Sequence, residues 1–371
     1  MTTYWRLGAT AAIVILGSPC LIQALDVVTP DNRTLDEIYS LAKNESGPLN
    51  IIFGGSSAAA AAPILAAFSK QYPDVVLNAT TDLSKYVDTV IDRSYITNNP
   101  YVDIAILQTV NDYPRWRDEG RLLKYKPATF DEINNSIKDP NGAYVPVNIY
   151  QFGPFYYDNT KVTPERVPKS YADILDPYWK GKLVLTYPND DDGVLTLFSL
   201  IISRYGFAWF DALMEQDVLW VRGASAASTT IINAHNSTNT TDSARSLTFT
   251  ALGGFTPSTS FLTVAQPQAP EQFMSWGQLL GIFASTPRPE SAKLFASFVL
   301  SNEWQSSLAA AGPVVMDSLN QQFGHALFEA NNTQVTGYIT FMGDRARVEW
   351  WRMQIETTLG LPQGPDPPTG R

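Results

Sequence analysis

The chain has 371 residues, of which 44% are hydrophobic and 17% charged, and its formal net charge is −10 at pH 7. This length exceeds a single domain of about 100 to 200 residues, so we predict two lobes, and the hydrophobic content argues against a disordered chain. The acidic balance argues against nucleic acid and anionic lipid as partners, because each would require a basic face.

Residues 1–24 have the pattern of a secretory signal peptide. Arg6 precedes an apolar stretch over 9–16, and Ala24 closes the segment like a cleavage site. Pro19 and its neighbours cut the apolar run below the ~18 to 20 residues of a membrane span. We therefore predict a secreted, extracellular protein without membrane insertion after signal removal. A membrane anchor and a lipid on Cys20, the only cysteine, are the alternatives.

Seven positions fit the Asn-x-Ser/Thr pattern of N-glycosylation, which is more than we expect by chance from this composition. The pattern predicts a glycoprotein of a eukaryotic secretory route. The seven candidates are Asn32, Asn44, Asn78, Asn134, Asn236, Asn239 and Asn331.

The first predicted element of the mature chain is a lead-in helix over 35–44, because Thr34 and Glu37 fit a capping box. Short β-rich runs then alternate with helical stretches, which is typical of an α/β fold with helix-covered, mainly parallel sheets. The predicted strands are 49–53, 102–107, 182–187 and 218–221, and the helices that follow them are 58–72, 110–119, 193–205 and 224–234. A further helix is predicted over 289–300 from apolar residues at helical spacing.

Four loops follow the predicted strands and lead into helices. In open α/β sheets, ligands bind at this edge, where loops meet helix N-termini with free N–H groups. The same small and polar residues are also ordinary helix caps, which is the alternative for each loop. The candidate ligand-binding residues are Gly54, Gly55, Ser56 and Ser57; Thr109 and Asn111; Asp190, Asp191 and Asp192; and Arg222 and Ser225.

Two stretches carry a family resemblance. "VPKSYADILDPYWKGKLVLTYPNDDD" and "STPRPESAKLFASFVLSNEWQ" resemble segments of type II extracellular (periplasmic-type) solute-binding proteins, in the branch that serves ferric-iron ABC transporters. The whole chain is similar to a secreted, mostly fungal set of such proteins. The resemblance implies a two-lobed, periplasmic-binding-protein-like type II fold, with a cleft between lobes joined by two crossing strands near 147–152 and 266–274. The fold does not name the ligand.

The resemblance also implies how the chain divides. We predict a lead-in helix within 25–48, a discontinuous lobe 1 from 49–148 and 268–361, a lobe 2 from 149–267, and a flexible tail over 362–371. The implied function is binding of a small polar solute or ion by a monomer without a cofactor, with an undefined membrane transporter as partner. The alternatives are a secreted enzyme that uses cleft carboxylates and a secreted surface or effector protein with a relict cleft.

Residues with other chemistry favour structural roles. Tyr156 and Tyr157 are adjacent, like the iron ligands of ferric-binding relatives, but those ligands follow a later strand, near 222–225 here; we expect one tyrosine in the core and no iron site. His235 is predicted on a surface loop, and neither it nor His325 has the spacing of a zinc site or a catalytic triad. The serines of "GGSSAAAA" are predicted to begin a helix. The tryptophans 350 and 351 are expected to pack a helix onto the body.

The stretch "NDDDG" at 189–193 has more acids than a helix start requires. Asn189 or an early Asp can cap the predicted helix 193–205, and acids in a first turn are favoured by the helix dipole. Because this loop is predicted to face the cleft, we hypothesise that Asp190, Asp191 or Asp192 contacts a cationic group of the solute.

Overall fold

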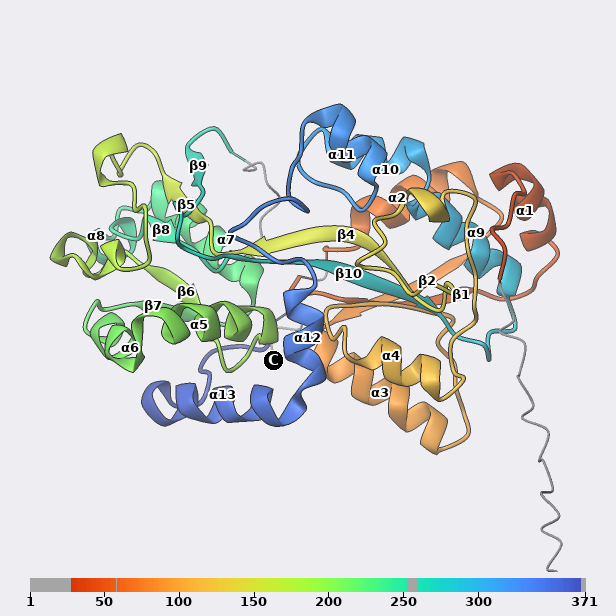
Figure 1. The fold of residues 1–371 in the computed structure, drawn as a ribbon, viewed down its shortest axis with the longest axis horizontal. Helices are drawn as coiled ribbons and strands as arrows, with labels where there is room; N and C mark the ends of the chain where they lie inside the picture. The colour runs from red at the N-terminus through yellow and green to blue at the C-terminus, as the bar shows by residue number, and fades with distance from the viewer. Residues whose placement is uncertain (1–27, 58, 252–258, 368–371) are drawn as a thin grey trace, which may run out of the picture.

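The computed structural model describes residues 28–57, 59–251 and 259–367, so the predicted signal peptide, with Cys20, lies outside the described residues. Figure 1 shows an elongated molecule with two lobes joined by strands that run side by side across its middle. The two-lobed α/β fold predicted from the sequence is confirmed.

Lobe 1 is built on a five-stranded mixed sheet. Its strand order is β2-β1-β3-β10-β4, with β1 parallel to β2 and β3, and β10 antiparallel to β3 and β4. The prediction of mainly parallel sheets is therefore only partly right, because the chain returns from lobe 2 in the reverse direction. The strands are β1 (Leu49–Gly54), β2 (Leu77–Asp82), β3 (Ile104–Leu107), β4 (Val145–Phe152) and β10 (Met274–Ile282).

Helices cover both faces of this sheet. On one face an apolar cluster joins Ile38, Phe68 and Phe295, which come from α1, α2 and α9. On the other, Ile91, Tyr113 and Tyr338 belong to a second cluster that continues into lobe 2. The helices are α1 (Leu35–Ala42), α2 (Ala62–Gln71), α3 (Ser84–Ile96), α4 (Asp112–Asp118), α9 (Pro289–Val299), α10 (Asn302–Ala309), α11 (Asp317–Phe323) and α12 (Gly337–Gly343).

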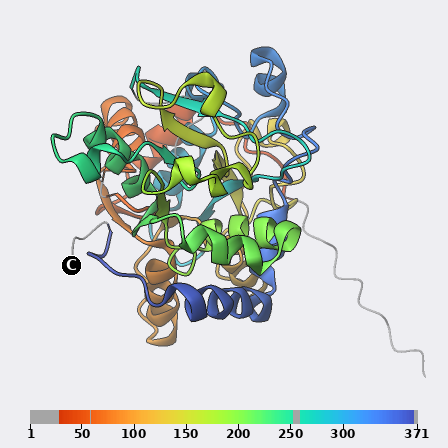
Figure 2. The same cartoon turned by 90° about the vertical axis from the view of Figure 1, so that its left-hand side faces the viewer.

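Lobe 2 contains short strands wrapped by helices, as the end-on view in Figure 2 shows. Strand β5 lies between β8 and β9 with antiparallel pairing, and β6 pairs in parallel with β7. The elements are β5 (Phe155–Asp158), β6 (Val184–Thr186), α5 (Asp192–Tyr205), α6 (Phe207–Met214), β7 (Leu219–Val221), α7 (Ala224–His235), α8 (Thr240–Ser243), β8 (Leu247–Thr248) and β9 (Leu262–Ala265). Short 3₁₀ turns lie at Pro164–Arg166, Asp173–Leu175 and Pro177–Trp179 in this lobe and at Phe130–Glu132 in lobe 1.

The two long strands that link the lobes are β4 and β10. They pair from Met274 opposite Phe152 to Leu280 opposite Val145, with an irregularity between Gln278 and Leu279. The first crossing coincides with the predicted segment, whereas the second begins where the predicted segment 266–274 ends. Residues 266–273 contain two prolines among mainly polar residues, and they do not belong to the ladder.

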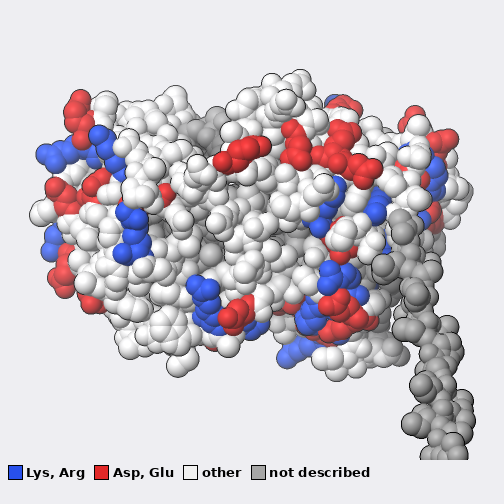
Figure 3. Space-filling view, viewed as in Figure 1, with Lys and Arg blue, Asp and Glu red and all other residues white. Residues whose placement is uncertain are grey.

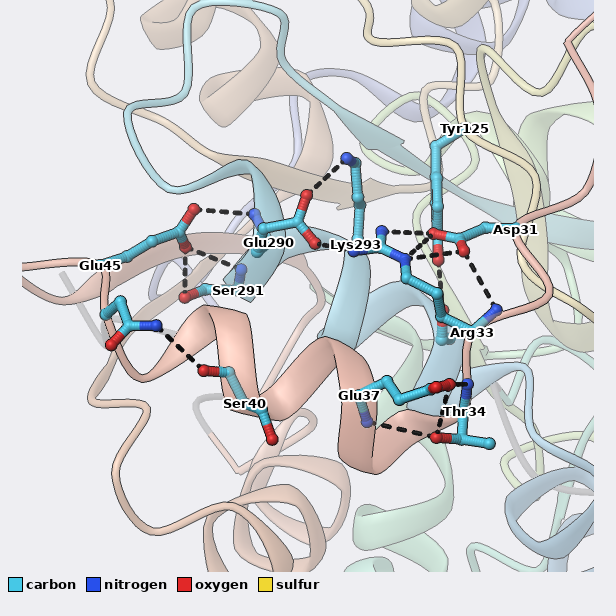
Figure 4. Close-up of polar contacts among 12 residues, drawn as sticks. Asp31, Arg33, Thr34, Glu37, Ser40, Glu45, Tyr125, Glu290, Ser291 and Lys293 are labelled. Atoms are coloured by element: carbon cyan, nitrogen blue, oxygen red, sulfur yellow. Dashed lines mark hydrogen bonds and ion pairs between the residues drawn. The ribbon is translucent and has the colours of Figure 1, made fainter.

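The lead-in helix is held by polar contacts at both of its ends, drawn in Figure 4. The predicted capping box of Thr34 and Glu37 is present. Before it, Arg33 donates to Glu290 at 2.7 Å and to Asp31. After it, the Glu45 carboxylate accepts the backbone N–H groups of residues 290 and 291 at 2.9 and 2.8 Å, which caps α9 from another element.

The C-terminal helix α13 (Arg345–Leu359) packs against α5 of lobe 2, below α12 in Figure 1. Trp351 is buried in this contact, as predicted, but Trp350 is half exposed. Just before the predicted tail 362–371, Gly360 accepts a hydrogen bond from Asn189 at 2.8 Å. Within the tail, Asp366 pairs with Arg222 of lobe 2 at 2.8 Å.

Figure 3 shows the charged side chains on one face of the molecule. On the face drawn in Figure 3, acidic and basic side chains lie close together, and the described residues form no broad basic area there. Among the described residues, no single helix is long and apolar enough to cross a membrane; α5 and α6, bent by 113° at their junction, pass that test only as a pair.

Candidate functional site

A cavity of about 70 Å³ lies where the predicted loops of the two lobes meet. Its wall contains residues from the ends of β1 and β3, from the start of α3, from the crossing strands and from the starts of α5 and α7. The lining residues are Gly54, Gly55, Ser56, Ala60, Leu83, Ser84, Lys85, Gln108, Thr109, Tyr150, Asp190, Asp191, Asp192, Ala224, Ser225, Trp276, Gln278 and Tyr338.

On the lobe 1 side, the loops after β1 and β3 are fixed by close packing. A Cβ atom on Gly54 would lie 1.9 Å from the hydroxyl oxygen of Ser84, so the position admits only glycine unless Ser84 moves. The Ser84 hydroxyl accepts the backbone N–H of Gln108 at 2.9 Å, and Gln278 donates to the carbonyl of Gly54 at 3.1 Å. The polar wall on this side is therefore preorganised.

Direct polar contacts between several residue pairs join the lobes beside the cavity, among them the hydrogen bond from Gln108 Nε2 of lobe 1 to Asp191 Oδ1 of lobe 2 at 2.9 Å. The hydroxyls of Ser56 and Ser225 are 2.8 Å apart, and the backbone N–H of Ser225 donates to Ser56 Oγ at 3.2 Å. Lys85 of lobe 1 donates to Asp190 Oδ1 of lobe 2 at 2.7 Å and to the Asp190 carbonyl at 2.9 Å. The lobes thus close around the cavity by contacts between side chains that also line it.

Each of the three consecutive acids has its own partners. Asp191 caps α5, as predicted for an early Asp, by accepting the N–H groups of Gly193 and Val194 at 2.8 and 3.1 Å. Asp192 pairs with Arg352 of α13 at 2.5 Å. Besides Lys85, Asp190 binds Arg222 through two hydrogen bonds of 2.9 and 3.2 Å.

The surroundings of the acids shift their pKa values in opposite directions. Burial acts to raise the pKa of Asp190, but the hydrogen bond from Arg222 and the charge of Lys85 outweigh it, so the pKa is lowered. Burial raises the pKa of Asp191, although its hydrogen bonds from Val194 and Gln108 oppose the shift. The acids are therefore compensated within the protein and leave no free pair of carboxylates for a cation.

Other buried polar atoms of the lining have no hydrogen-bond partner among the described residues. They are the hydroxyl of Thr109, which is 5% exposed, and the indole N–H of Trp276, which is 2% exposed. The Tyr338 hydroxyl is similarly buried, and burial together with the charges of Asp192 and Asp191 raises its pKa well above the usual value. Because unpaired buried polar groups are costly, these atoms are candidate contacts for a solute.

The predicted site residues fall into two groups. Those that line the cavity are Gly54, Gly55, Ser56, Thr109, Asp190, Asp191, Asp192 and Ser225. Arg222 lies behind the wall, where it holds Asp190. Ser57 and Asn111 lie outside the lining: Ser57 closes a turn by accepting the N–H of Ala59, and Asn111 precedes α4. The helix α2 begins at Ala62 rather than at residue 58, so the serines precede its start by about a turn.

Sequence reasoning missed the residues that other elements bring to the cavity. Lys85 comes from α3, a helix that the sequence did not predict. Tyr338 comes from α12, which lies more than two hundred residues after α3 in the chain. Tyr150, Trp276 and Gln278 come from the crossing strands. A polar Gln278 inside an otherwise apolar strand run was the available signal for the last of these.

The tyrosines and histidines lie elsewhere. We expected one of the adjacent tyrosines in the core, whereas both Tyr156 and Tyr157, on β5, are buried. Burial raises the pKa of Tyr156 to about 12. His235 ends α7 rather than lying on a surface loop; it contacts the buried Asp158 carboxylate at 2.8 Å and stacks on Phe261. The described residues contain no group of three or more His, Cys, Asp or Glu side chains able to hold a metal ion.

The fold and the interlobe cavity define a two-lobed, periplasmic-type solute-binding protein. Residues 99–338 match the family model of the bacterial extracellular solute-binding proteins, and the chain belongs to this family. It is thus a member of a family whose proteins bind solutes.

Solved structures share the fold at low sequence identity. The substrate-binding protein of an ABC transporter from Agrobacterium tumefaciens is 14% identical, with a TM-score of 0.66 over 85% of this chain and 96% of that one. AfuA from Actinobacillus pleuropneumoniae, with fructose-6-phosphate bound, is 17% identical, with a TM-score of 0.62 over 85% and 99%. Iron-bound HitA from Pseudomonas aeruginosa is 14% identical, with a TM-score of 0.59 over 83% and 99%. A search of curated protein sequences found no match.

Proposed function

We propose that this protein is secreted and closes its two lobes on a small polar solute in the cavity between Ser56, Lys85, Thr109, Asp190 and Ser225. The observation that carries the proposal is that residues of both lobes line one cavity and also touch each other across it. Hinged closure on a solute requires this arrangement, since the contacts that hold the closed form then lie beside the ligand.

The free groups of the cavity favour a solute with hydrogen-bond acceptors. The indole of Trp276 can only donate, and the hydroxyls of Thr109 and Tyr338 can donate. The ammonium group of Lys85, although paired with Asp190, adds a positive charge to the wall. The nearby acids already accept hydrogen bonds from protein groups. We therefore replace the hypothesis of a cationic group by that of an oxygen-bearing polar solute, with Gly54, Gly55 and the three acids shaping the wall.

Ferric iron is a weaker candidate, although HitA is iron-bound. The tyrosines in the cavity wall are Tyr150 and Tyr338, and burial raises the pKa of both hydroxyls, which opposes the phenolate form that iron needs. Tyr156 and Tyr157 are not part of the lining.

The proposal includes export and glycosylation. The leader predicts removal of residues 1–24, and the side chains of Asn32, Asn44, Asn78, Asn236, Asn239 and Asn331 are exposed, as modification requires. Asn134 is the one of the seven that is only half exposed, so we expect it to be modified least. The leader and the exposed sequons agree with the secreted, fungal-type set that the sequence resembles.

The test begins with native mass spectrometry of the secreted protein to identify a co-purified solute. Thr109→Val is then compared with wild type by calorimetry, using the recovered compound. Because the Thr109 hydroxyl has no described protein partner, we expect binding to weaken about three- to tenfold with unchanged stability.

The exposed Thr358→Val on α13 is the matched control and should leave affinity unchanged. If no compound is recovered, and amines, amino acids, metal ions, sugars and oxyanions all leave the melting temperature unchanged, the cleft is relict and the proposal fails. Turnover of the bound compound would instead support the alternative of a secreted enzyme.

A further inference from the structure

A second and larger cavity adjoins the interlobe cavity. Its volume is about 260 Å³, and it shares Gly54, Ala60, Tyr150 and Gln278 with the lining already described. We call it the α2–α10 compartment. Its lining residues are Phe53, Gly54, Ala60, Pro63, Ile64, Asn148, Ile149, Tyr150, Gln278, Trp304, Gln305, Leu308, Ala311, Gly312, Pro313 and Val314.

The wall of this compartment is mainly apolar. Pro63 and Ile64 come from the first turn of α2, Trp304 and Leu308 lie one turn apart on α10, and Pro313 follows that helix. Water gains few hydrogen bonds against such walls, whereas apolar carbon that enters is removed from water. The compartment is thus suited to a ring or a short aliphatic chain.

The wall also has polar residues, namely Asn148, Tyr150, Gln278 and Gln305. Gln305 is fully buried, and its amide nitrogen donates to the carbonyls of Val147 at 3.0 Å and Val299 at 2.8 Å. These two acceptors determine which end of the amide is nitrogen, since a flipped amide would place oxygen against both carbonyls. The remaining atom, Oε1, has no partner among the described residues. This amide oxygen can only accept a hydrogen bond, so its partner must carry an N–H or O–H group.

We propose that the α2–α10 compartment is a second subsite of the solute site, and that it takes an apolar ring or chain bearing an N–H or O–H donor, which Gln305 Oε1 accepts. The polar end of the same solute lies in the interlobe cavity, past Tyr150 and Gln278. This inference rests on the proposed function and narrows the solute to a small organic compound with an oxygen-bearing head and an apolar body. A bare metal ion or inorganic oxyanion would fill only the smaller cavity.

The subsite is tested with small aromatic probes, because they do not depend on the unknown polar head. Phenol carries a ring and one O–H donor, whereas anisole has a similar ring without a donor. We expect saturable binding of phenol to the full-length secreted protein at low millimolar concentration, measured by calorimetry, and binding of anisole about tenfold weaker. Equal affinity for phenol and anisole would overturn the assignment of Gln305, and lack of saturable phenol binding would overturn the subsite.

Variants then locate the probe. Leu308→Trp should fill the compartment and reduce phenol affinity at least tenfold, and Trp304→Ala should weaken it by removing one wall. Leu41→Trp on α1, at an exposed leucine, is the matched control and should leave phenol binding unchanged. Circular dichroism and melting curves confirm that each variant is folded. If Leu308→Trp binds phenol like the wild type, phenol binds elsewhere and the proposal is wrong.

Continuity of the two cavities is tested with longer probes. 3-(4-Hydroxyphenyl)propionate and its primary amide place a carboxylate or an amide oxygen beyond the ring, toward Lys85. At least one of them should bind about tenfold more tightly than phenol and lose that gain in Lys85→Met. If neither does, the compartments do not serve one solute. If native mass spectrometry finds a purely inorganic solute whose binding is weakened by Thr109→Val but not by Leu308→Trp, the proposed function stands and this inference alone fails.

Discussion

Replacing Asp190 by asparagine should destabilise the protein strongly, because this carboxylate is the centre of a buried ion cluster. Its side chain is 5% exposed, and it faces Lys85 at 2.7 Å and Arg222 at 2.9 Å. Removing one partner of a buried pair typically costs about 3 to 5 kcal/mol, and since asparagine retains part of the hydrogen bonding, we expect a loss of about 2 to 4 kcal/mol in the free energy of unfolding.

The pH dependence of this loss gives a second readout. The folded-state pKa of Asp190 is lowered, so its contribution is present above the unfolded value near 3.8 and is lost as the pH falls through the lower folded pKa. Urea denaturation of wild type and Asp190→Asn should therefore differ at pH 7, begin to converge below about pH 3.8, and coincide once the pH lies below the lowered folded-state pKa. Asp118→Asn, at an exposed acid paired with Arg117, is the control and should leave the midpoint unchanged. Equal midpoints at pH 7, or a gap that persists at low pH, would refute the reasoning.

Three further substitutions probe separate features. Asp191→Ala removes the cap of α5 and should cost about 0.5 to 2 kcal/mol in urea denaturation, whereas full stability would show that the cap is dispensable. Burial and the neighbouring Asp112 raise the pKa of Asp88 to about 7, so this group lowers the free energy of unfolding increasingly from pH 4 to pH 7. Asp88→Asn should therefore raise the free energy of unfolding by about 1 to 2 kcal/mol at pH 7 and little at pH 4. An equal effect at both pH values would contradict this cause. Gly54→Ala should cost about 1 to 3 kcal/mol through its clash with Ser84, and Ser84→Gly should partly restore the double variant; no restoration would place the strain elsewhere.

The sequence predicted the elements whose signals are local. The capping box at Thr34 and Glu37 and the apolar face of α9 depend on neighbours within a few turns, and both are present as expected. The strand β2 was missed because alternating exposure along 77–82 goes with polar Asn and Thr residues rather than with an apolar run. Because β2 was not predicted, the helix that follows it, α3, was not predicted either, and Lys85 was therefore missed.

The candidate site was predictable only in part, for a geometric reason. Loops that follow strands meet at one edge of a sheet, so Gly54, Thr109 and Asp190 could be placed together from their positions alone. The contacts of the C-terminal segment could not, because the sequence assigns this segment to lobe 1 and to a flexible tail. There, Arg352 pairs with Asp192, and Asp366 pairs with Arg222, which holds Asp190. A count of charges in the loop therefore overstated the free negative charge in the cleft.

The same contacts explain why an acidic loop can line a cavity that favours acceptors. Asp190 connects the two lobes rather than offering a free carboxylate to the solute, because it pairs with Lys85 of one lobe and Arg222 of the other. A solute that binds Lys85 must share that ammonium group with Asp190, so solute binding and lobe contact depend on one side chain. Substituting Lys85 should consequently weaken both, while Thr109→Val should weaken only binding, and this difference separates a residue that closes the lobes from one that solely recognises the solute.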